Sequence, residues 1–414
     1  MSTFDPDGRR RFLRQACTVG AAGTLAGHAL TSLAAPATVT LPFANGEREL
    51  IAYPQKRPLI RQTSRPPQLE TPFAVFNDGV ITPNDAFFVR YHLGNIPTAI
   101  DPAAYRLRVS GKVGTPLELS LADLKQQFGA PVELVAVTQC SGNSRGFFEP
   151  RVGGGQLGNG AMGNARWLGI PLKRILEKAG IQAGARQVTF EGLDRPVLPG
   201  TPEFVKALDA AHALDGEVML AYAMNGADLP MLNGFPVRLV VPGYYGTYWV
   251  KHLADIKVLD TEFDGFWMQK AYRIPDNDCA CTPVGKAPEK TRPIGRYNVR
   301  SFITSLADGA RVARGRPVPV RGIAFDGGHG IREVQFSADD GKTWHAARLG
   351  QDLGRYSFRE WHAEFTPDKA GAYALKVRAT NMAGETQPLD PLWNPSGYML
   401  SLIHISEPTR QEAI

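Results

Sequence analysis

The sequence contains few cysteines and lacks the cysteine motifs on which several protein classes depend. Only 4 cysteines occur among 414 residues, so a fold built on disulfides is not expected. Cys279 and Cys281 are separated by a single residue, which is too close for an unstrained disulfide or a usual zinc pair. The sequence has no Cys-x-x-Cys-His motif, so this chain is not expected to carry a c-type haem.

Tracts of one charge are also scarce. Lys and Arg number 46 against 40 Asp and Glu, which gives a net charge of +6. Because no dense basic tract with interleaved aromatic residues occurs, nucleic-acid binding is not expected. The mild positive charge instead favours anionic substrates or an acidic protein partner. A hydrophobic content of 43% is ordinary for a soluble globular protein, and 414 residues favour two domains.

The N-terminus has the pattern of an export signal. Residues 9–14, RRRFLR, fit the twin-arginine pattern, and a weakly apolar, Ala- and Gly-rich stretch follows over residues 16–33. We therefore expect residues 1–37 to be a cleaved signal peptide. Their glycines and modest hydrophobicity argue against a stable membrane span, although an uncleaved anchor is the alternative. Since this route exports folded proteins, it suits an enzyme loaded with a complex cofactor, and it predicts a periplasmic protein.

Changes in composition divide the rest of the chain. Residues 38–80 are rich in Pro, Arg and Gln and are expected to form an extended N-terminal arm. Over residues 81–290, short apolar strands alternate with helical patterns without regular βαβ repetition, which predicts an α+β domain. Evenly spaced strands separated by turn residues predict an immunoglobulin-like β-sandwich over residues 296–399. Residues 400–414 resemble translated adapter sequence, so we expect a non-native tail in place of the native last strand.

Cys140 is the strongest single candidate for chemistry. An apolar run over residues 134–137 predicts a buried strand that delivers this thiol into a turn of small residues. Arg145 follows five residues later, and a neighbouring cation favours the thiolate. With no second cysteine at zinc-finger spacing, such a thiolate suits a soft transition metal better than a structural zinc. A buried, unreactive cysteine is the alternative.

Several ordered motifs together resemble one family. They occupy residues 82–92, 139–145, 160–169, 221–226, 234–243, 250–251, 337–344 and 393–394. Over about residues 70–399 the chain resembles the sulfite oxidase family of molybdopterin enzymes, in particular the bacterial periplasmic sulfite and sulfane dehydrogenases. The resemblance implies a molybdopterin-binding catalytic domain over residues 81–290 and an immunoglobulin-like dimerisation domain over residues 296–399. It also implies one molybdenum–pterin cofactor per chain.

The resemblance assigns roles to individual residues. Cys140 would supply the protein thiolate to molybdenum, Arg90 and Arg145 would form an anion pocket, and Tyr272 would be the active-site tyrosine. An arginine presents a fixed fork of donors that suits an oxyanion, and a phenol can donate a hydrogen bond to substrate. Surface ion pairing and core packing are the alternatives for these side chains. The residues implied to hold the cofactor are Phe88, Val89, Arg90, His92, Asp194, Asn233, Arg238, Trp249, Val250 and Lys251.

Two positions depart from the family pattern. Leu157 stands where the family usually has a tryptophan that lines the substrate pocket, so we expect a wider pocket without an indole N–H donor. His329 falls where animal members place a third active-site arginine, so the anion site is expected to be less positive and dependent on pH.

The resemblance implies oxidation of sulfite to sulfate. Because this chain has no haem motif, the electrons are expected to pass to a separate periplasmic c-type cytochrome. A sulfane dehydrogenase subunit that oxidises carrier-protein-bound sulfur is one alternative. A non-catalytic binding protein on the same scaffold is another. The second domain implies a homodimer or heterodimer.

Overall fold

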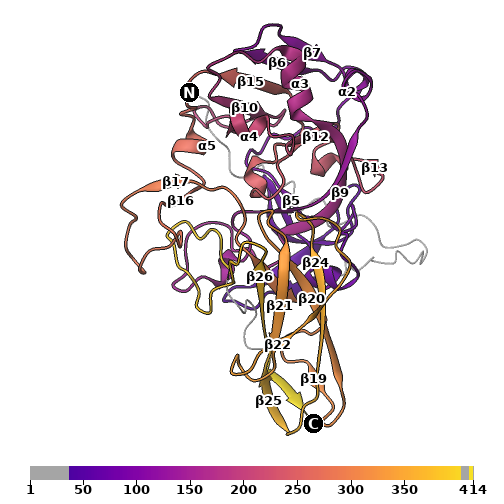
Figure 1. Ribbon diagram of the computed structural model, residues 1–414, viewed down its shortest axis with the longest axis vertical. Coiled ribbons are helices and arrows are strands. Elements are labelled where there is room, and N and C mark those ends of the chain that lie inside the picture. The colour runs from indigo at the N-terminus through magenta and orange to yellow at the C-terminus, as the bar shows by residue number, and fades with distance from the viewer. Residues whose placement is uncertain (1–36, 402–409, 414) are drawn as a thin grey trace, which may run out of the picture. The chain divides into compact units, whose positions relative to one another are not determined.

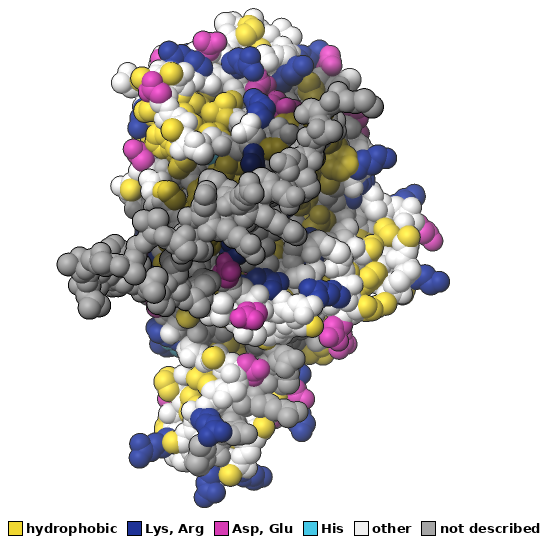
Figure 2. All heavy atoms as spheres, turned by 180° about the vertical axis from the view of Figure 1, so that it is seen from behind, with side chains coloured by type: hydrophobic (Ala, Val, Ile, Leu, Met, Phe, Trp, Pro, Cys, Tyr) yellow, Lys and Arg dark blue, Asp and Glu magenta, His cyan; other side chains and the backbone are white. Residues whose placement is uncertain are grey.

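The computed structural model describes residues 37–401 and the backbone of residues 410–413 (Figure 1). The predicted signal peptide, except for its last residue, and most of the suspected tail lie outside the described residues. In the part of the chain that is described, every helix is too short or too polar to cross a bilayer. On the face shown in Figure 2, Lys and Arg side chains are spread among acidic and apolar ones.

The segment expected to be an extended arm contains paired strands. It contributes four of the five strands of an antiparallel sheet, in the order β1-β2-β3-β4-β5. Their bounds are β1 (Thr38–Thr40), β2 (Glu47–Ile51), β3 (Leu59–Ser64), β4 (Pro67–Glu70) and β5 (Val89–Arg90). Strand β4 pairs with β5, a strand from the catalytic domain. This pairing fixes the backbone of Arg90, which β5 carries.

A mixed sheet forms one side of the catalytic domain, with the order β11-β10-β15-β6-β7. Only β6 and β15 in it are parallel. Its strands are β6 (Leu107–Gly111), β7 (Leu117–Leu119), β10 (Gln187–Glu191), β11 (Val205–Asp209) and β15 (Asp255–Leu259). The short helices of the domain are η1 (Phe73–Asn77), α2 (Leu121–Gln126), η2 (Arg145–Phe147), α3 (Leu172–Ala179), α4 (Ala210–Ala213), η3 (Met231–Asn233), η4 (Gly246–Tyr248) and α5 (Phe266–Gln269).

Capping residues mark one end of each of two helices. Ser120 caps α2, and its side chain and that of Asp123 form a capping box. Gly180 ends α3 in the left-handed conformation, with φ of 69°. Helix α3 begins at Leu172, because the preceding strand continues through Pro171 in its pairing with β12.

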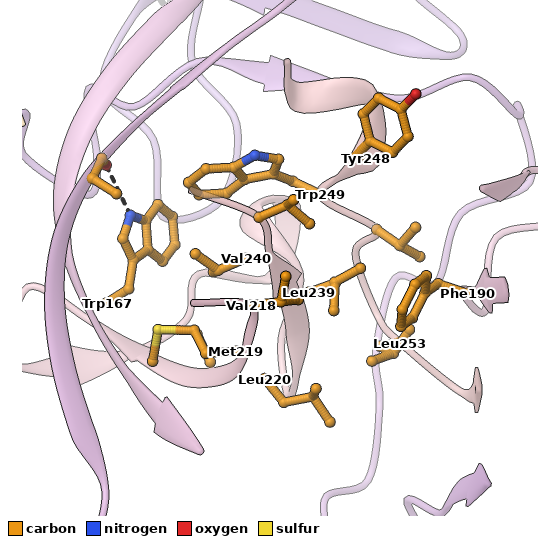
Figure 3. Packing of buried hydrophobic residues seen from close by; sticks show 14 of the residues in the cluster. Trp167, Phe190, Val218, Met219, Leu220, Leu239, Val240, Tyr248, Trp249 and Leu253 are labelled. Atoms are coloured by element: carbon orange, nitrogen blue, oxygen red, sulfur yellow. Dashed lines mark hydrogen bonds between the residues drawn. The ribbon is translucent and has the colours of Figure 1, made fainter. Parts of the chain in front are cut away.

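An antiparallel sheet in the order β13-β12-β9-β8 carries the cysteine, and β14 also pairs with β12. Its strands are β8 (Val132–Gln139), β9 (Met162–Pro171), β12 (Met219–Met224), β13 (Ala227–Asp228) and β14 (Arg238–Val240). Figure 3 shows the core beside it, where the rings of Trp167 and Trp249 lie 5.5 Å apart. The Trp167 indole N–H donates to the carbonyl of Ala136 at 3.0 Å, which ties the core to β8.

The second domain is the β-sandwich that the sequence predicts. One sheet contains β18 (Arg300–Ile303), β20 (Val318–Phe325), β24 (Arg359–Phe365) and β23 (Arg348–Leu349). A second contains β22 (His345–Ala346), β21 (Ile331–Ser337) and β26 (Lys376–Asn381), and a third contains β19 (Arg311–Val312), β27 (Arg410–Ala413) and β25 (Gly371–Ala374). Buried Trp361 and Val320 of the first sheet share one core with Val334 and Val377 of the second. The pair β16 (Arg273–Pro275) and β17 (Thr291–Pro293) precedes the domain.

The interpretation of the closely spaced cysteines was wrong. Cys279 and Cys281 form a disulfide, with their Cα atoms 5.1 Å apart. Ala280 between them adopts a left-handed conformation, with φ of 49°, which turns the chain back between the two side chains. Such a turn has no signature in the spacing of the residues. Cys140 is the free cysteine of the described residues.

The suspected tail is described in part. Leu400 and Ser401 are buried, and the Ser401 hydroxyl donates to the carbonyl of Val299 at 2.5 Å. Strand β27 lies between β19 and β25. That residues 400–414 are non-native stays a prediction.

Candidate active site

Strand pairing places Cys140 at the mouth of a cavity. Strands β8 and β9 pair along their length, and β8 ends at Gln139. The backbone N–H of Cys140 then donates to the carbonyl of Ala161 at 2.9 Å, and its own carbonyl accepts from Asn143 N–H at 3.0 Å. The side chain is 8% exposed and lines both cavities described below. The predicted strand and turn therefore position this thiol as expected.

The small residues of the turn make room for Arg145. A Cβ atom added to Gly142 would lie 2.6 Å from an Arg145 Nη atom, so a larger residue there would displace the guanidinium. Ser144 adopts a left-handed conformation, with φ of 73°, immediately before η2. This backbone brings the arginine back beside the thiol that precedes it in the sequence.

An inner cleft with about 440 Å³ of atom-free space gathers most of the predicted cofactor residues. The predicted residues that line it are Phe88, Arg90, His92, Cys140, Asn233, Arg238, Lys251 and Tyr272. The sequence interpretation missed the other lining residues, Phe87, Thr138, Ser141, Leu232, Gly246 and Thr247. Ser141 and Thr247 belong to small-residue segments beside the predicted motifs, but a single sequence does not distinguish such hydroxyls from turn residues.

Buried polar atoms in this cleft lack partners. Among the described residues, the hydroxyls of Ser141 and Thr247 and the Nε atom of Arg238 are buried without a hydrogen bond. Buried polar groups of folded proteins are normally paired, because an unpaired one loses its hydration without replacement. A bound group that is rich in acceptor atoms, such as a pterin with a phosphate, would satisfy these three atoms. The donor set of the cleft therefore fits the cofactor implied by the sequence.

The same cleft concentrates positive charge. Burial lowers the pKa of Lys56 to about 7 and that of Arg238 to about 10. Burial and then Arg238 also lower the pKa of Lys251, whereas Asp194 opposes this shift. Lys56, which the sequence interpretation missed, donates to the side-chain oxygen of Asn233. A bound phosphate would offset these buried cations, which supports the predicted role of this side of the cleft.

His92 and Tyr272 face each other beside the cysteine. The His92 Nε2 and Tyr272 hydroxyl atoms are 2.5 Å apart. Burial, followed by Arg90 and Lys251, holds the pKa of His92 well below its usual value, and burial raises the pKa of Tyr272. At neutral pH the imidazole is therefore neutral and the phenol keeps its proton. Tyr272 also adopts φ of 57°, a rare conformation for an aromatic residue that often marks a functional site.

An outer cavity with about 1300 Å³ of atom-free space opens from the cysteine. Arg90, Cys140 and Tyr272 line both cavities, and the outer one adds Gln68, Arg145, Leu157, Lys270, Arg273, Ser396 and Tyr398 among others. Four cations and no carboxylate belong to the residues that line it. Arg145 donates to the carbonyls of Gly155 and Ser396 at 3.4 and 3.3 Å and lies 5.0 Å from the ring of Tyr398. The cavity thus presents uncompensated positive charge beside the thiol.

The two departures from the family pattern have different outcomes. Leu157 is buried and lines the outer cavity, as expected. His329 lines a different cavity together with Cys279 and Arg296, and its N–H donates to Asp326 at 3.1 Å. The expectation that His329 contributes to the anion site was wrong, because the turn between β20 and β21 faces this other cavity. The C-terminal segment of the second domain supplies Ser396 and Tyr398 instead.

Four residues predicted to bind the cofactor line neither cavity. Val89 packs with Leu59 and Leu69, and Val250 belongs to the main core. Trp249 lies below the guanidinium of Arg238, 5.6 Å from it, and Asp194 is buried near Lys251. The structure places these residues behind the lining of the cleft.

Two buried cations behind the site were missed. Lys206 donates to the carbonyl of Trp267 at 2.7 Å and lies 5.4 Å from the ring of Tyr272. Arg300, in the second domain, donates to the side chains of Gln139 and Ser144. Each is a charged residue at an inward position of a strand, which is a signal that the sequence does contain.

Comparisons with known proteins identify the family of both domains. Residues 93–267 match the family described as oxidoreductase molybdopterin binding domain, and residues 291–406 match the Mo-co oxidoreductase dimerisation domain. The chain is 34% identical to the sulfite oxidase of Gallus gallus over 85% of its own length and 78% of the relative. It is 30% identical to that of Arabidopsis thaliana, over 88% and 97%. For the mitochondrial sulfite oxidase of Homo sapiens the identity is 35%, over 85% of this chain and 66% of the relative.

A solved structure shows the same architecture. The crystal structure of the sulfane dehydrogenase SoxCD from Paracoccus pantotrophus matches with a TM-score of 0.67 and 26% identity, over 79% of each chain. The predicted fold class and the molybdenum–pterin cofactor are confirmed by these comparisons. The chain therefore belongs to the sulfite oxidase family of molybdopterin oxidoreductases.

Proposed function

We propose that this oxidoreductase converts sulfite to sulfate and passes the electrons to a separate c-type cytochrome. The observation that carries the proposal is the outer cavity, whose lining has four cations and no carboxylate next to the thiol of Cys140. A small divalent anion gains most from such a site, because arginine side chains form charge-assisted hydrogen bonds with oxyanions.

The residues of the chain bind and orient the substrate. When bound, the molybdenum–pterin cofactor supplies the two-electron oxidation of the substrate sulfur. Arg90 and Arg145 hold the oxygen atoms of sulfite, which directs its sulfur toward the centre that Cys140 anchors. The Tyr272 phenol keeps its proton and donates a hydrogen bond to His92 or to a substrate oxygen. The release of sulfate is favoured when these hydrogen bonds exchange with water in the open cavity.

A specific observation favours a second candidate, the oxidation of sulfur carried on a partner protein. Leu157 and the glycines at positions 153–155 line the outer cavity, which leaves room for a flexible carrier arm. The structural match to a sulfane dehydrogenase points the same way. In that case the two arginines would hold an anionic end of the carried sulfur group.

One assay separates the two candidates. The purified, molybdenum-loaded enzyme is supplied with free sulfite or with a sulfur-loaded carrier protein, and the reduction of a c-type cytochrome is followed. We expect saturable reduction with sulfite alone. Reduction that requires the carrier would overturn the proposal in favour of the second candidate. Elemental analysis that finds no molybdenum in folded protein would instead favour a non-catalytic binding protein.

The proposed location is the periplasm, reached by twin-arginine export, and the proposed assembly is a homodimer or heterodimer through the second domain. The twin-arginine motif and the match to a dimerisation domain support these proposals. Replacement of Arg9, Arg10 and Arg11 by lysine should retain the protein in the cytoplasmic fraction, because the export machinery reads the arginine pair. Periplasmic recovery equal to that of the wild type would contradict this route.

A further inference from the structure

Arg300 enters the back of the active site from the second domain. It is the first residue of β18, and its side chain is 1% exposed. One guanidinium nitrogen donates to the side-chain oxygen of Gln139 at 2.9 Å, and another donates to the hydroxyl of Ser144 at 2.7 Å. These two acceptors stand on either side of Cys140 in the sequence. The guanidinium therefore spans the base of the turn that carries the thiol.

The same hydrogen bonds connect Arg300 with the substrate side of the turn. The Ser144 hydroxyl, which accepts from Arg300, donates to Asn159 at 2.6 Å. Ser144 N–H donates to the carbonyl of Gly158 at 2.7 Å, next to the pocket residue Leu157. A displacement of Arg300 would thus alter both the thiol turn and the adjoining wall of the outer cavity.

The charge of Arg300 is not balanced within the described residues. No ion pair there joins its guanidinium to a carboxylate, and its Nε atom is buried without a hydrogen bond. Its pKa, although lowered by burial to about 10, keeps the side chain cationic at neutral pH. A buried cation loses its hydration and requires a compensating anion. Cys140 lies in the sequence between the two acceptors of this guanidinium, Gln139 and Ser144, and it would bring negative charge to the turn as the thiolate that anchors the metal centre.

We propose that Arg300 is a positioning residue that fixes the thiol turn and offsets the negative charge of the cysteine-anchored molybdenum centre, which raises its reduction potential. A fixed cation at close range stabilises the more negative, reduced state of such a centre. The inference rests on the cofactor of the family and is independent of whether sulfite or carrier-bound sulfur is the substrate.

The test compares three variants of the molybdenum-loaded full chain. Arg300→Gln removes the charge, Arg300→Lys keeps it, and Arg378→Gln is the matched control. Arg378 also donates to a glutamine oxygen, that of Gln335 at 2.7 Å, but within the second sheet of the second domain. The measurement is the midpoint potential of the molybdenum centre, from a redox titration followed by the electron paramagnetic resonance signal of its one-electron state. Thermal unfolding of each variant verifies the fold.

We expect Arg300→Gln to leave about tenfold less of the centre reduced at a given potential, which is a fall of about 59 mV for one electron. Arg300→Lys should shift the midpoint much less, and Arg378→Gln should leave it unchanged. A folded Arg300→Gln variant with the wild-type midpoint would overturn the proposal. So would equal shifts in Arg300→Gln and Arg300→Lys, because these would indicate a purely structural role.

A second variant covers the case in which Arg300→Gln does not fold. Gln139→Glu places a carboxylate against Arg300 at nearly constant shape, so the guanidinium stays buried but its charge is neutralised. The midpoint potential should again fall relative to the wild type. An unchanged midpoint in this variant would overturn the proposal. Because no substrate is used, failure of the sulfite assay does not affect either result.

Discussion

At the scale of single residues, the site depends on side chains that keep their charge in a dry environment. Arg145 is almost fully buried, and its hydrogen bonds within the chain reach only carbonyl oxygens at 3.3 and 3.4 Å. Its guanidinium therefore retains most of its capacity to bind an anion. The phenol of Tyr272 and the imidazole of His92 stay uncharged at neutral pH for the same reason of burial. The positive charge that a substrate meets thus comes from arginine, which stays protonated at neutral pH.

Arg145→Gln should impair the reaction with sulfite more than it lowers the stability of the fold. A hydrogen bond to a charged group contributes about 1.5–3 kcal/mol, so kcat/KM for sulfite should fall by about 10- to 150-fold. Most of the loss should appear in KM if the arginine binds the substrate and the transition state equally well. Steady-state kinetics with sulfite measure this split, and the molybdenum content serves as the control. Unchanged kcat/KM in a fully loaded variant would contradict the assigned role.

At the scale of helices and strands, the sequence predicted the features that neighbouring residues determine. The strand that delivers Cys140 depends on a run of neighbouring apolar residues, so the sequence alone predicted it. Contacts between distant segments were not predictable in this way. Tyr398 and Arg300 reach the site from the second domain, and β4 brings the arm segment against β5. No periodicity or spacing in a single sequence indicates which of these segments meet.

The wrong predictions for His329 and for the Cys279–Cys281 pair have physical causes of the same kind. His329 was assigned to the anion site by its order in the chain, but the turn that carries it faces another cavity. The disulfide of Cys279 depends on the left-handed backbone of Ala280, which the residue type does not favour. In both cases the outcome depends on the direction of a turn, which short sequence motifs do not define.

Glu70, the last residue of β4, holds the loop that carries Leu157. Its carboxylate is 1% exposed and accepts hydrogen bonds from the N–H groups of Gly158 and Gly160 at 3.1 and 3.2 Å. Burial raises its pKa from 4.5 to about 7. The folded state therefore binds a proton more tightly than the unfolded state. The stability that this residue contributes is present below pH 4.5 and is lost as the pH rises toward 7.

Glu70→Gln should remove this pH dependence. The difference in unfolding free energy between wild type and variant should change by about 3 kcal/mol between pH 4.5 and 7, in the direction that lowers the stability of the wild type. Denaturant unfolding of both proteins at several pH values in this range measures the change. A constant difference across the range would show that the carboxyl is ionised in the folded protein throughout.

At the scale of the whole molecule, the cofactor and the fold are coupled. Lys56, Arg238 and Lys251 are buried together, and polar atoms of Ser141 and Thr247 lack partners in the described chain. The protein without its cofactor therefore keeps unfavourable charge and unpaired polar groups in its interior. A ligand that binds only the folded state stabilises it, so cofactor loading should stabilise the whole domain.

Protein produced without molybdopterin should consequently melt at a lower temperature than loaded protein. Burial and then Arg238 lower the pKa of Lys251, which lines the cleft, to about 7, so the difference should widen below neutral pH, where this lysine gains its proton and binds a phosphate more strongly. Thermal unfolding of the two forms at pH 6 and pH 8 measures both effects. Equal melting temperatures at both pH values would contradict the coupling between cofactor and fold.

The proposed function requires that the Cys140 thiolate binds the molybdenum of the cofactor. X-ray absorption at the molybdenum edge tests it most directly, because it counts the sulfur atoms around the metal and does not depend on substrate, acceptor or turnover. The comparison is between the loaded wild-type protein and a loaded Cys140→Ser variant. We expect one sulfur neighbour fewer in the variant, and an equal number of sulfur neighbours in both proteins would contradict the assignment of Cys140 as a ligand.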